Sequence, residues 1–202
     1  MARPDARRAC GGAGDKLTTL LHTALTLAAH GLHVFPCWPA RKEPATSHGF
    51  LDATTDPDVI RQWWRHEPQF NVAVATGELS KIFVVDIDGL DAESELRKLE
   101  AEHGALPATV EAITGHGRHL YFKMPGISVR NSESRIAPKI DVRGSGGYAL
   151  CPPSLHPSGK RYAWSVDSAK AFAAAPDWLL ARIASAPTAA QRWRRHRRNG
   201  AP

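Results

Sequence analysis

The sequence has few cysteines, and none of them stands in a spacing that binds a metal. Of its 202 residues three are cysteines, Cys10, Cys37 and Cys151, and they are far apart in the chain. No Cys-x-x-Cys pair and no array of closely spaced histidines accompanies them, so a structural zinc site is not expected. Isolated cysteines in odd number indicate reduced thiols rather than a disulfide framework.

Long hydrophobic runs are also missing. Hydrophobic residues make up 43% and charged residues 23% of the chain, which is ordinary for a globular protein. No apolar stretch has the length needed to cross a bilayer, and the first residues, Met1 to Asp5, lack the apolar core of a secretory signal. We therefore expect a cytoplasmic protein that does not bind a membrane.

The excess of basic residues is concentrated at the end of the chain. Lysine and arginine total 26 against 20 acidic residues, and five of the arginines, but no acid, follow Ala186. The rest is nearly neutral, so overall charge alone does not indicate nucleic-acid binding. The tail, with Arg194 and Arg195, either contacts phosphates non-specifically or only keeps the chain soluble.

These shifts in composition divide the chain into three parts. We expect residues 1–15 to be a disordered leader and residues 186–202 to be a disordered basic tail. Residues 16–185 are enough to bury one good core and should form the folded domain.

The most informative stretch runs from Lys81 to Gly89. Its continuous apolar run is rich in β-branched residues and closes on glycine, which is typical of a buried central strand. Because strand side chains alternate, Asp86 and Asp88 should share one face, with Ile87 on the other. Two anions held so close need a cation, and hard ions such as Mg²⁺ or Mn²⁺ prefer oxygen ligands. A pair that only caps the next helix is the alternative.

Periodicity and turn residues place the other elements. Helices are expected over residues 16–30, from 55 to before 68, 91–103 and 177–184, and further strands at 33–36, 71–77, 109–114, 118–122, 139–143, 148–151 and 161–164. Because a tight turn joins the strand at 71–77 to the Asp86 strand, the two should pair antiparallel. Residues 125–138 show no clean period and predict a polar surface loop. Hairpins interspersed with helices favour an α+β fold with mixed or antiparallel sheets.

Several kinds of enzyme carry an Asp-x-Asp pair after such a strand. In phosphatases of the haloacid dehalogenase type the pattern is Asp-x-Asp-Gly-Thr, but here Leu90 replaces the threonine and no later Asp-Asp pair follows. In a nucleotide-sugar transferase the pair holds one metal on a diphosphate, but nothing else in the chain indicates a sugar site. Both remain minor alternatives.

A third interpretation accounts for more of the chain. The Asp86-Ile87-Asp88 segment, His119 within Gly117-Arg118-His119-Leu120-Tyr121-Phe122, and Asp141 within Ile140-Asp141-Val142-Arg143-Gly144 resemble the three motifs of the archaeo-eukaryotic primase superfamily. The resemblance is closest to the bifunctional primase/polymerase, or prim-pol, domain. Further matches are Phe35-Pro36-Cys37, Lys42-Glu43-Pro44, Ala53 to Pro57, Trp63-Trp64, Asn71 to Gly77, Gly104 to Pro107, Gly144 to Tyr148, Pro152-Pro153-Ser154 and Asp177-Trp178-Leu179. The resemblance spans about residues 17–185, with one departure where His116 interrupts the glycines that often precede the Arg-His pair.

The resemblance implies both a fold and a set of roles. The fold would be a primase/polymerase-type catalytic core whose sheet lobe is similar to an RNA-recognition motif, with a smaller N-terminal α/β unit beside it. Asp86, Asp88 and Asp141 would hold two divalent ions, Mg²⁺ or Mn²⁺, as nucleotidyl transfer requires. His119 would be a catalytic residue that contacts the triphosphate. Further contacts with the triphosphate would come from Arg118, Arg143 and Lys42.

We therefore expect a template-dependent nucleotidyltransferase, a DNA primase/polymerase that makes or extends strands on single-stranded DNA from nucleoside triphosphates. A local patch of Arg130, Arg135 and Lys139 is a candidate for template binding. The alternative is a non-catalytic nucleic-acid-binding module that assists replication, although all three carboxylates are present. Because the chain carries no helicase, an unwinding partner would be a separate protein or the chain is a fragment of a longer one.

Overall fold

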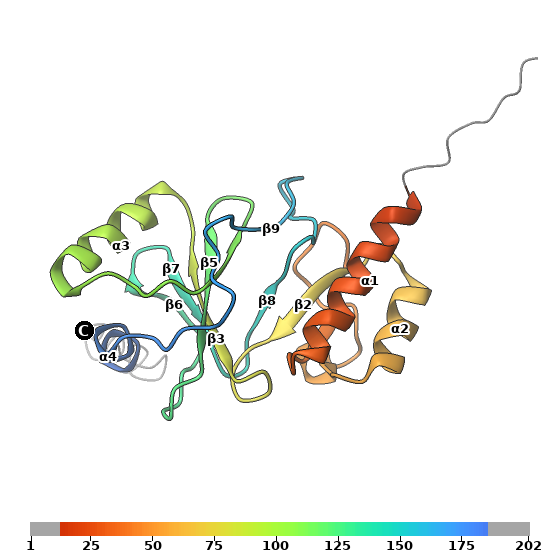
Figure 1. The fold of residues 1–202 in the computed structure, drawn as a ribbon, viewed down its shortest axis with the longest axis horizontal. Helices are drawn as coiled ribbons and strands as arrows, with labels where there is room; N and C mark the ends of the chain where they lie inside the picture. Colours follow the sequence, from red (N-terminus) through yellow and green to blue (C-terminus); the bar gives the residue numbers. More distant parts are fainter. Residues whose placement is uncertain (1–12, 186–202) are drawn as a thin grey trace, which may run out of the picture.

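The computed structural model describes residues 13–185, which form two antiparallel sheets and four α-helices (Figure 1). The α+β class is therefore as expected. In chain order the elements are α1 Ala13–Ala29, β1 Val34–Cys37, the short 3₁₀-helix η1 Gly49–Asp52, α2 Pro57–His66, β2 Asn71–Ala75, β3 Ile82–Ile87, α3 Leu90–His103, β4 Val110–Ile113, β5 Arg118–Lys123, β6 Ser132–Ala137, β7 Ile140–Arg143, β8 Tyr148–Leu150, β9 Ala163–Trp164 and α4 Asp177–Ser185.

The smaller sheet has the strand order β1-β2-β8, and α1 and α2 lie together beside it at one end of the molecule (Figure 1). All residues of β1 and β2 are buried. Helix α2 begins where the Asp-Pro pair predicts, because the side chain of Asp56 accepts a hydrogen bond of 2.8 Å from the backbone N–H of Asp58. Its Trp64 is buried and donates its indole N–H to the Phe70 carbonyl at 3.0 Å.

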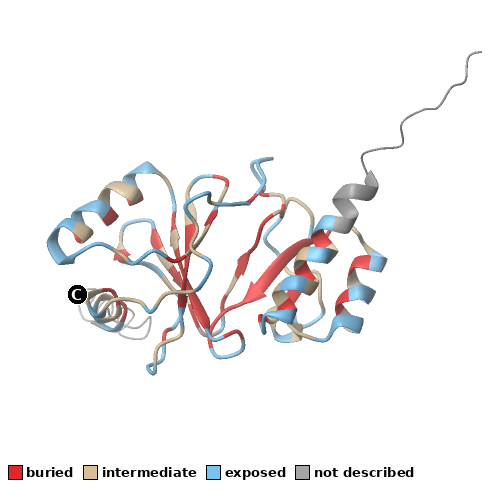
Figure 2. Cartoon of the chain, in the orientation of Figure 1, coloured by how far each residue is buried: buried red, intermediate tan, exposed pale blue. Residues whose placement is uncertain are grey.

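The larger sheet has the order β6-β7-β3-β5-β4-β9, so β3 lies in its interior between β7 and β5. Phe83, Val85 and Ile87 project from one face of β3 and pack with Leu96 of α3 and Leu179 of α4, all of them buried (Figure 2). The alternation expected for β3 is confirmed. Helices α3 and α4 thus cover one face of this sheet at the other end of the molecule (Figure 1).

The opposite face of the larger sheet contacts the N-terminal elements. Ile82 and Val84 of β3 belong to one buried cluster with Val72 and Val74 of β2 and with Ala24 of α1. Asp86 follows Ile82 and Val84 with the same alternation, so it lies on the face that is turned away from α3 and α4.

The predicted pairing of β2 with β3 is wrong. β2 pairs with β1 and β8, β3 pairs with β5 and β7, and the connection between them holds a single bridge from Gly77 to Ile82. The cause lies in distant residues, since the backbone N–H of Thr76 donates to the Gly147 carbonyl at 2.9 Å. That contact turns the end of β2 into the smaller sheet, so the short connection joins two sheets instead of closing a hairpin.

The prediction of a loop over residues 125–138 is also wrong in part, because β6 occupies Ser132–Ala137 and pairs with β7. β6 is an edge strand with a register irregularity, and only Ile136 is buried, so the sequence shows no clean alternation. Helix α1 begins at Ala13, within the expected leader. Residues 1–12 of that leader and all of the tail lie outside the described residues.

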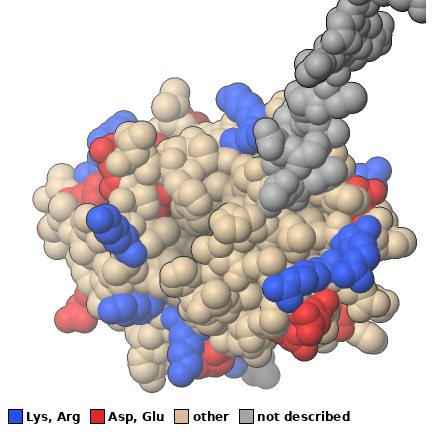
Figure 3. Space-filling view, turned by 45° about the vertical axis from the view of Figure 1, so that its right-hand side comes forward, with Lys and Arg blue, Asp and Glu red and all other residues tan. Residues whose placement is uncertain are grey.

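Charged side chains are spread over the described surface, as the nearly neutral body predicts. On the face shown in Figure 3 the central area is uncharged, and lysines and arginines stand mainly toward its margin. Among the helices of residues 13–185, none has the length and apolarity needed to cross a membrane.

Candidate active site

Asp86 lies in the middle of a row of polar residues that crosses three strands. Its partner in the register with β5 is His119, and its partner in the register with β7 is Asp141. Directly opposed residues on adjacent strands have neighbouring side chains on the same face. The sheet therefore brings together three residues that are up to 55 positions apart in the sequence.

An arginine and a histidine contact the carboxylates of this row. Arg143, two residues after Asp141, places Nη2 2.9 Å from Oδ2 of Asp141 and 3.4 Å from Oδ2 of Asp86. His119 places Nε2 3.4 Å from Oδ1 of Asp86. Burial opposes ionisation of Asp86, but the contact with His119 and the charge of Arg143 outweigh it and lower its pKa to about 2. Arg143 thus gives Asp86 and Asp141 a shared positive partner, whereas the sequence predicted a divalent ion between Asp86 and Asp88.

Asp88 lies one residue beyond the end of β3 and is exposed. Its backbone N–H donates to the Lys139 carbonyl at 3.0 Å, which joins the end of β3 to the start of β7. Within residues 13–185 no group of three or more His, Cys, Asp or Glu side chains is arranged to hold a metal ion. The described residues therefore contain no preformed cluster of Asp86, Asp88 and Asp141.

The polar row opens into a cavity of about 240 Å³ between the larger sheet and the N-terminal elements. Its lining residues are Lys42, Phe50, Asp86, His119, Asn131, Arg143, Gly146, Gly147, Tyr148, Ala149, Leu150 and Tyr162. Lys42, His119 and Arg143, three of the four predicted triphosphate contacts, therefore meet in one space. An anion bound there would face three nitrogen-bearing side chains.

Lys42 reaches the cavity from the loop that follows β1. Its backbone carbonyl accepts a hydrogen bond of 3.0 Å from the hydroxyl of Tyr148 on β8, and the backbone N–H of Trp38 donates to the Glu43 carbonyl at 3.0 Å. These bonds hold the loop closed over the cavity edge. The loop of residues 38–44 thus has a definite place relative to the acidic row.

The glycine-rich turn between β7 and β8 forms another wall. Asn131 accepts a hydrogen bond of 2.8 Å from the backbone N–H of Gly144 through its side-chain oxygen. A Cβ on Gly147 would lie 2.1 Å from that same oxygen, so a larger residue would displace Asn131. Asn131 therefore fixes the turn, and only glycine fits beside it.

The turn before β5 brings His119 to Asp86. A Cβ on Gly117 would lie 1.8 Å from the carbonyl oxygen of Ile87, so the hairpin turn can approach the end of β3 only with glycine at this position. The β4–β5 hairpin itself is confirmed, with Ala112 opposite His119. His119 is 6% exposed, and its Nδ1 has no hydrogen-bond partner among the described residues.

Sequence reasoning missed Tyr162 as a site residue. Tyr162 is buried, and its ring lies 5.8 Å from that of His119 and 5.6 Å from that of His156, measured between ring centroids. His156 in turn lies 5.3 Å from His116. Neither Tyr162 nor His156 belongs to a motif that the sequence analysis identified. Both come much later in the sequence than the acidic pair, in a region of short turns and strands.

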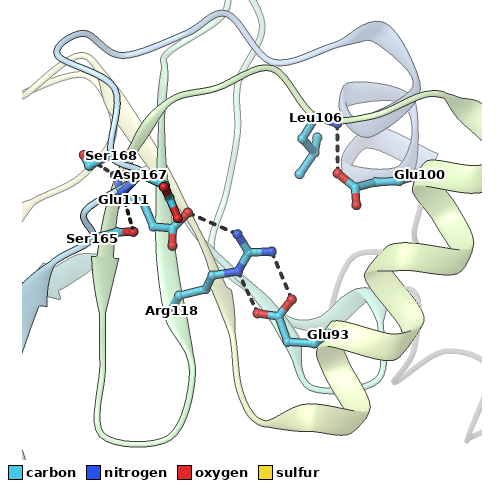
Figure 4. Close-up of polar contacts among 8 residues, drawn as sticks. All are labelled: Glu93, Glu100, Leu106, Glu111, Arg118, Ser165, Asp167 and Ser168. Atoms are coloured by element: carbon cyan, nitrogen blue, oxygen red, sulfur yellow. Dashed lines mark hydrogen bonds and ion pairs between the residues drawn. The ribbon is translucent and has the colours of Figure 1, made fainter.

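Arg118 does not line this cavity. Its own contacts are shown in Figure 4. It follows the turn on the opposite face from His119, where its guanidinium binds Glu93 of α3 at 2.6 and 2.9 Å and Glu111 of β4 at 3.1 Å. Burial opposes its charge, but the two glutamates outweigh burial and raise the pKa of Arg118. The expected role of Arg118 in nucleotide binding finds no support in this geometry, because strand alternation points it at α3.

The three residues of the predicted template patch do not act as one exposed group. Arg130 is exposed, but Nη1 of Arg135 donates to the Ile183 carbonyl of α4 at 3.3 Å, and Nζ of Lys139 lies 3.1 Å from Asp91. Arg135 and Lys139 thus have structural contacts of their own. Arg194 and Arg195 lie outside the described residues.

Comparison with known proteins agrees with the arrangement of these motifs. No curated protein matches the sequence at a significant level. Residues 24–178 match the model of a family described as bifunctional DNA primase/polymerase, N-terminal. The matched range contains Lys42, Asp86, Asp88, His119 and Asp141, and it covers most of the chain. The chain therefore belongs to the bifunctional DNA primase/polymerase family.

Proposed function

We propose that this protein is a template-dependent nucleotidyltransferase that makes or extends strands on single-stranded DNA from nucleoside triphosphates. One observation carries the proposal: Asp86 lies between His119 and Asp141 in the register of the sheet and faces a cavity that also contains Arg143 and Lys42. Carboxylates for metal ions and cations for phosphate are thus adjacent, as nucleotidyl transfer needs. Family membership points to the same reaction class.

The donor atoms in the acidic row suit Mg²⁺ or Mn²⁺. Asp86, Asp141 and Asp88 offer carboxylate oxygens, which are the ligands that these hard ions prefer. When bound, two such ions activate the attacking hydroxyl and stabilise the leaving group. In the structure Arg143 forms ion pairs with both Asp86 and Asp141. If Arg143 turned to a phosphate, the two carboxylates would need another counter-ion.

The proposed triphosphate contacts are Arg143, His119 and Lys42. Arginine and lysine donate strong charge-assisted hydrogen bonds to phosphate oxygens. His119 has a buried ring nitrogen, Nδ1, without a partner in the described chain. In a doubly protonated ring Nε2 would donate to Asp86 and Nδ1 would be free to donate to a phosphate oxygen, which would satisfy this buried polar atom. The side of the cavity opposite the acidic row is formed by the N-terminal elements, so a nucleotide would be held between the two sheets.

The fold supports a catalytic lobe similar to an RNA-recognition motif. Strand β3, helix α3 and the hairpin β4–β5 form a β-α-β-β unit, and β7 joins it on the outer side of β3. One face carries α3 and α4, and the other carries the polar row, which faces the N-terminal elements across the cavity. In the proposed arrangement the smaller sheet with α1 and α2 is the N-terminal unit that supplies Lys42.

For the template we propose Arg130 and the tail arginines, including Arg194 and Arg195, as non-specific phosphate contacts. The phosphatase and sugar-transferase alternatives and the non-catalytic module receive no support from the comparisons. The non-catalytic module differs from the proposal in one measurable respect, since it would bind template without adding nucleotides.

The decisive experiment is strand synthesis on primed and unprimed single-stranded DNA, with Mg²⁺ or Mn²⁺ and with ribo- or deoxyribonucleotides. Asp86→Asn should lower synthesis about 100-fold or more, the scale expected when one preorganised charge-stabilising group is lost. The matched control is Asp58→Asn, because the Asp58 side chain is 90% exposed on α2. Synthesis by Asp86→Asn at the control rate, or none by the unaltered protein under any condition, would overturn the proposal.

A second variant tests the triphosphate contact by equilibrium binding. His119→Ala should weaken nucleotide binding about 10- to 100-fold, as for a lost hydrogen bond to a charged group, and leave template binding unchanged. His66→Ala, which alters an exposed residue of α2, is the control. Equal weakening of nucleotide and template binding, with a lower melting temperature, would show that His119 is only a core residue.

A further inference from the structure

A second cavity lies on another side of the N-terminal elements. Its volume is about 490 Å³, and it runs between α1 and the segment of residues 168–172 that follows β9. Its walls are mostly apolar and include Leu27 of α1, Val74 of β2 and Phe172. A concave, mainly apolar space of this volume is typical of a small-molecule site.

Aromatic rings form one side of this cavity. The ring of Tyr121 lies 6.0 Å from that of Trp164 and 6.3 Å from that of Phe172, and all three residues line the space. Trp164 keeps 42% of its surface exposed, so part of the aromatic wall is open to a ligand. Flat or extended hydrocarbon groups pack well against such rings.

The charged groups at this cavity are all of one sign. Lys123 and Lys170 are exposed and line it together with His30, and no Asp or Glu is among the described residues that line it. Within residues 13–185 neither lysine takes part in an ion pair.

This cavity is distinct from the candidate active site. The two cavities share no lining residue. Tyr121 stands between them, because its ring also lies 6.2 Å from that of His119. A ligand in the second cavity would therefore touch a residue that contacts the polar row without entering it.

We propose that the second cavity binds an amphipathic organic anion, with an aromatic or aliphatic body and one carboxylate or sulfonate group. The body would fill the apolar space against Tyr121, Trp164 and Phe172, and the anionic group would lie at the Lys123 and Lys170 end. The proposal concerns binding alone, so it stands independently of the proposed polymerase activity.

The first test uses the dye anilinonaphthalene sulfonate, whose fluorescence rises in apolar surroundings, with the full-length protein. We expect saturable binding of one dye per chain that nucleoside triphosphate does not displace. Replacing Lys123 and Lys170 together by glutamine should weaken binding about 3- to 10-fold, the scale of two exposed charge contacts. Lys98→Gln, on the exposed side of α3, is the control. Displacement by nucleoside triphosphate, or equal affinity in both variants, would overturn the proposal.

Competition and cavity filling provide the second test. Decanoate should displace the dye at lower concentration than decanol, because only decanoate carries the anion that the lysines recognise. Thr23→Trp projects into the cavity and should reduce binding, whereas His22→Trp, at the neighbouring exposed position of α1, should not. Melting curves establish that both variants are folded. Equal competition by the acid and the alcohol would refute the anionic class, and unchanged binding in Thr23→Trp would place the dye elsewhere.

Discussion

Replacing Arg118 by methionine tests the assignment of this arginine to the structure of the sheet rather than to the nucleotide site. The substitution keeps most of the side-chain length but removes the guanidinium that joins Glu93 of α3 to Glu111 of β4 (Figure 4). Both glutamates would then remain close to one another without their counter-charge. The expected result is a less stable protein.

The magnitude follows from the burial of the three side chains. Arg118, Glu93 and Glu111 keep 27%, 21% and 16% of their side-chain surface exposed. Breaking a fully buried ion pair costs about 3–5 kcal/mol, and the remaining exposure reduces this to about 2–3 kcal/mol here. For a chain of this size that loss corresponds to a decrease of roughly 4–12 °C in melting temperature.

The assay is thermal and urea unfolding followed by circular dichroism, with Arg61→Met as the matched control. Arg61 pairs with Asp58 on the surface of α2, where the two side chains are 49% and 90% exposed, so its loss should cost less than about 1 kcal/mol. In the double variant with Glu93→Gln, part of the stability should return, because one of the two uncompensated charges is removed. Equal melting temperatures for Arg118→Met and Arg61→Met would refute the structural assignment.

Three further outcomes follow from the described contacts. The pKa of Asp86 is lowered to about 2, from about 4 in an unfolded chain, so its charge stabilises the fold above about pH 4. This stabilisation is lost as the pH falls toward 2. In Asp86→Asn the free energy of unfolding, measured by urea titration, should therefore fall less steeply between about pH 4 and pH 2. Gly117→Ala would place a Cβ 1.8 Å from a carbonyl oxygen and should destabilise the protein by about 1–3 kcal/mol or more, whereas Gly126→Ala, with no atom within 4 Å, should be nearly neutral in the same melting assay. Leu96→Ala empties a position in α3 that is 1% exposed and should cost about 2–5 kcal/mol, against less than about 0.5 kcal/mol for Leu90→Ala, which is 87% exposed on the same helix; similar values for the two would contradict the packing of α3 described here.

Local pattern was enough for elements whose signals lie within their own residues. The apolar run before Asp86 predicted a buried central strand, and β3 is one. The Asp-Pro start predicted α2, and Asp56 caps it. The glycines around residue 116 predicted the β4–β5 hairpin, in which Gly117 allows the close approach to β3. In these cases the period of the side chains and the chemistry of caps and turns act over a few residues.

Strand pairing depended on the tertiary structure. The short connection from β2 to β3 suggested a hairpin, but Thr76 bonds instead to the glycine-rich turn about 70 residues later in the chain. The edge strand β6 gives no clear pattern in the sequence, because its one buried residue, Ile136, is too weak a period-two signal. Pairing energy comes from partners that a local pattern does not contain.

The same division applies to the candidate site. The sequence alone determined the types of residue in the site, because motif order separated Asp86, His119 and Asp141 from ordinary acids and histidines, and the family match bears out the resemblance on which they rest. Which neighbours serve that site was decided by the tertiary structure. Strand alternation turns Arg118 away to α3, and folding brings Tyr162 beside His119 from a segment without any motif. A side chain's identity is local information, but its direction and its neighbours are set by the register of the sheet and by the packing of distant segments against it.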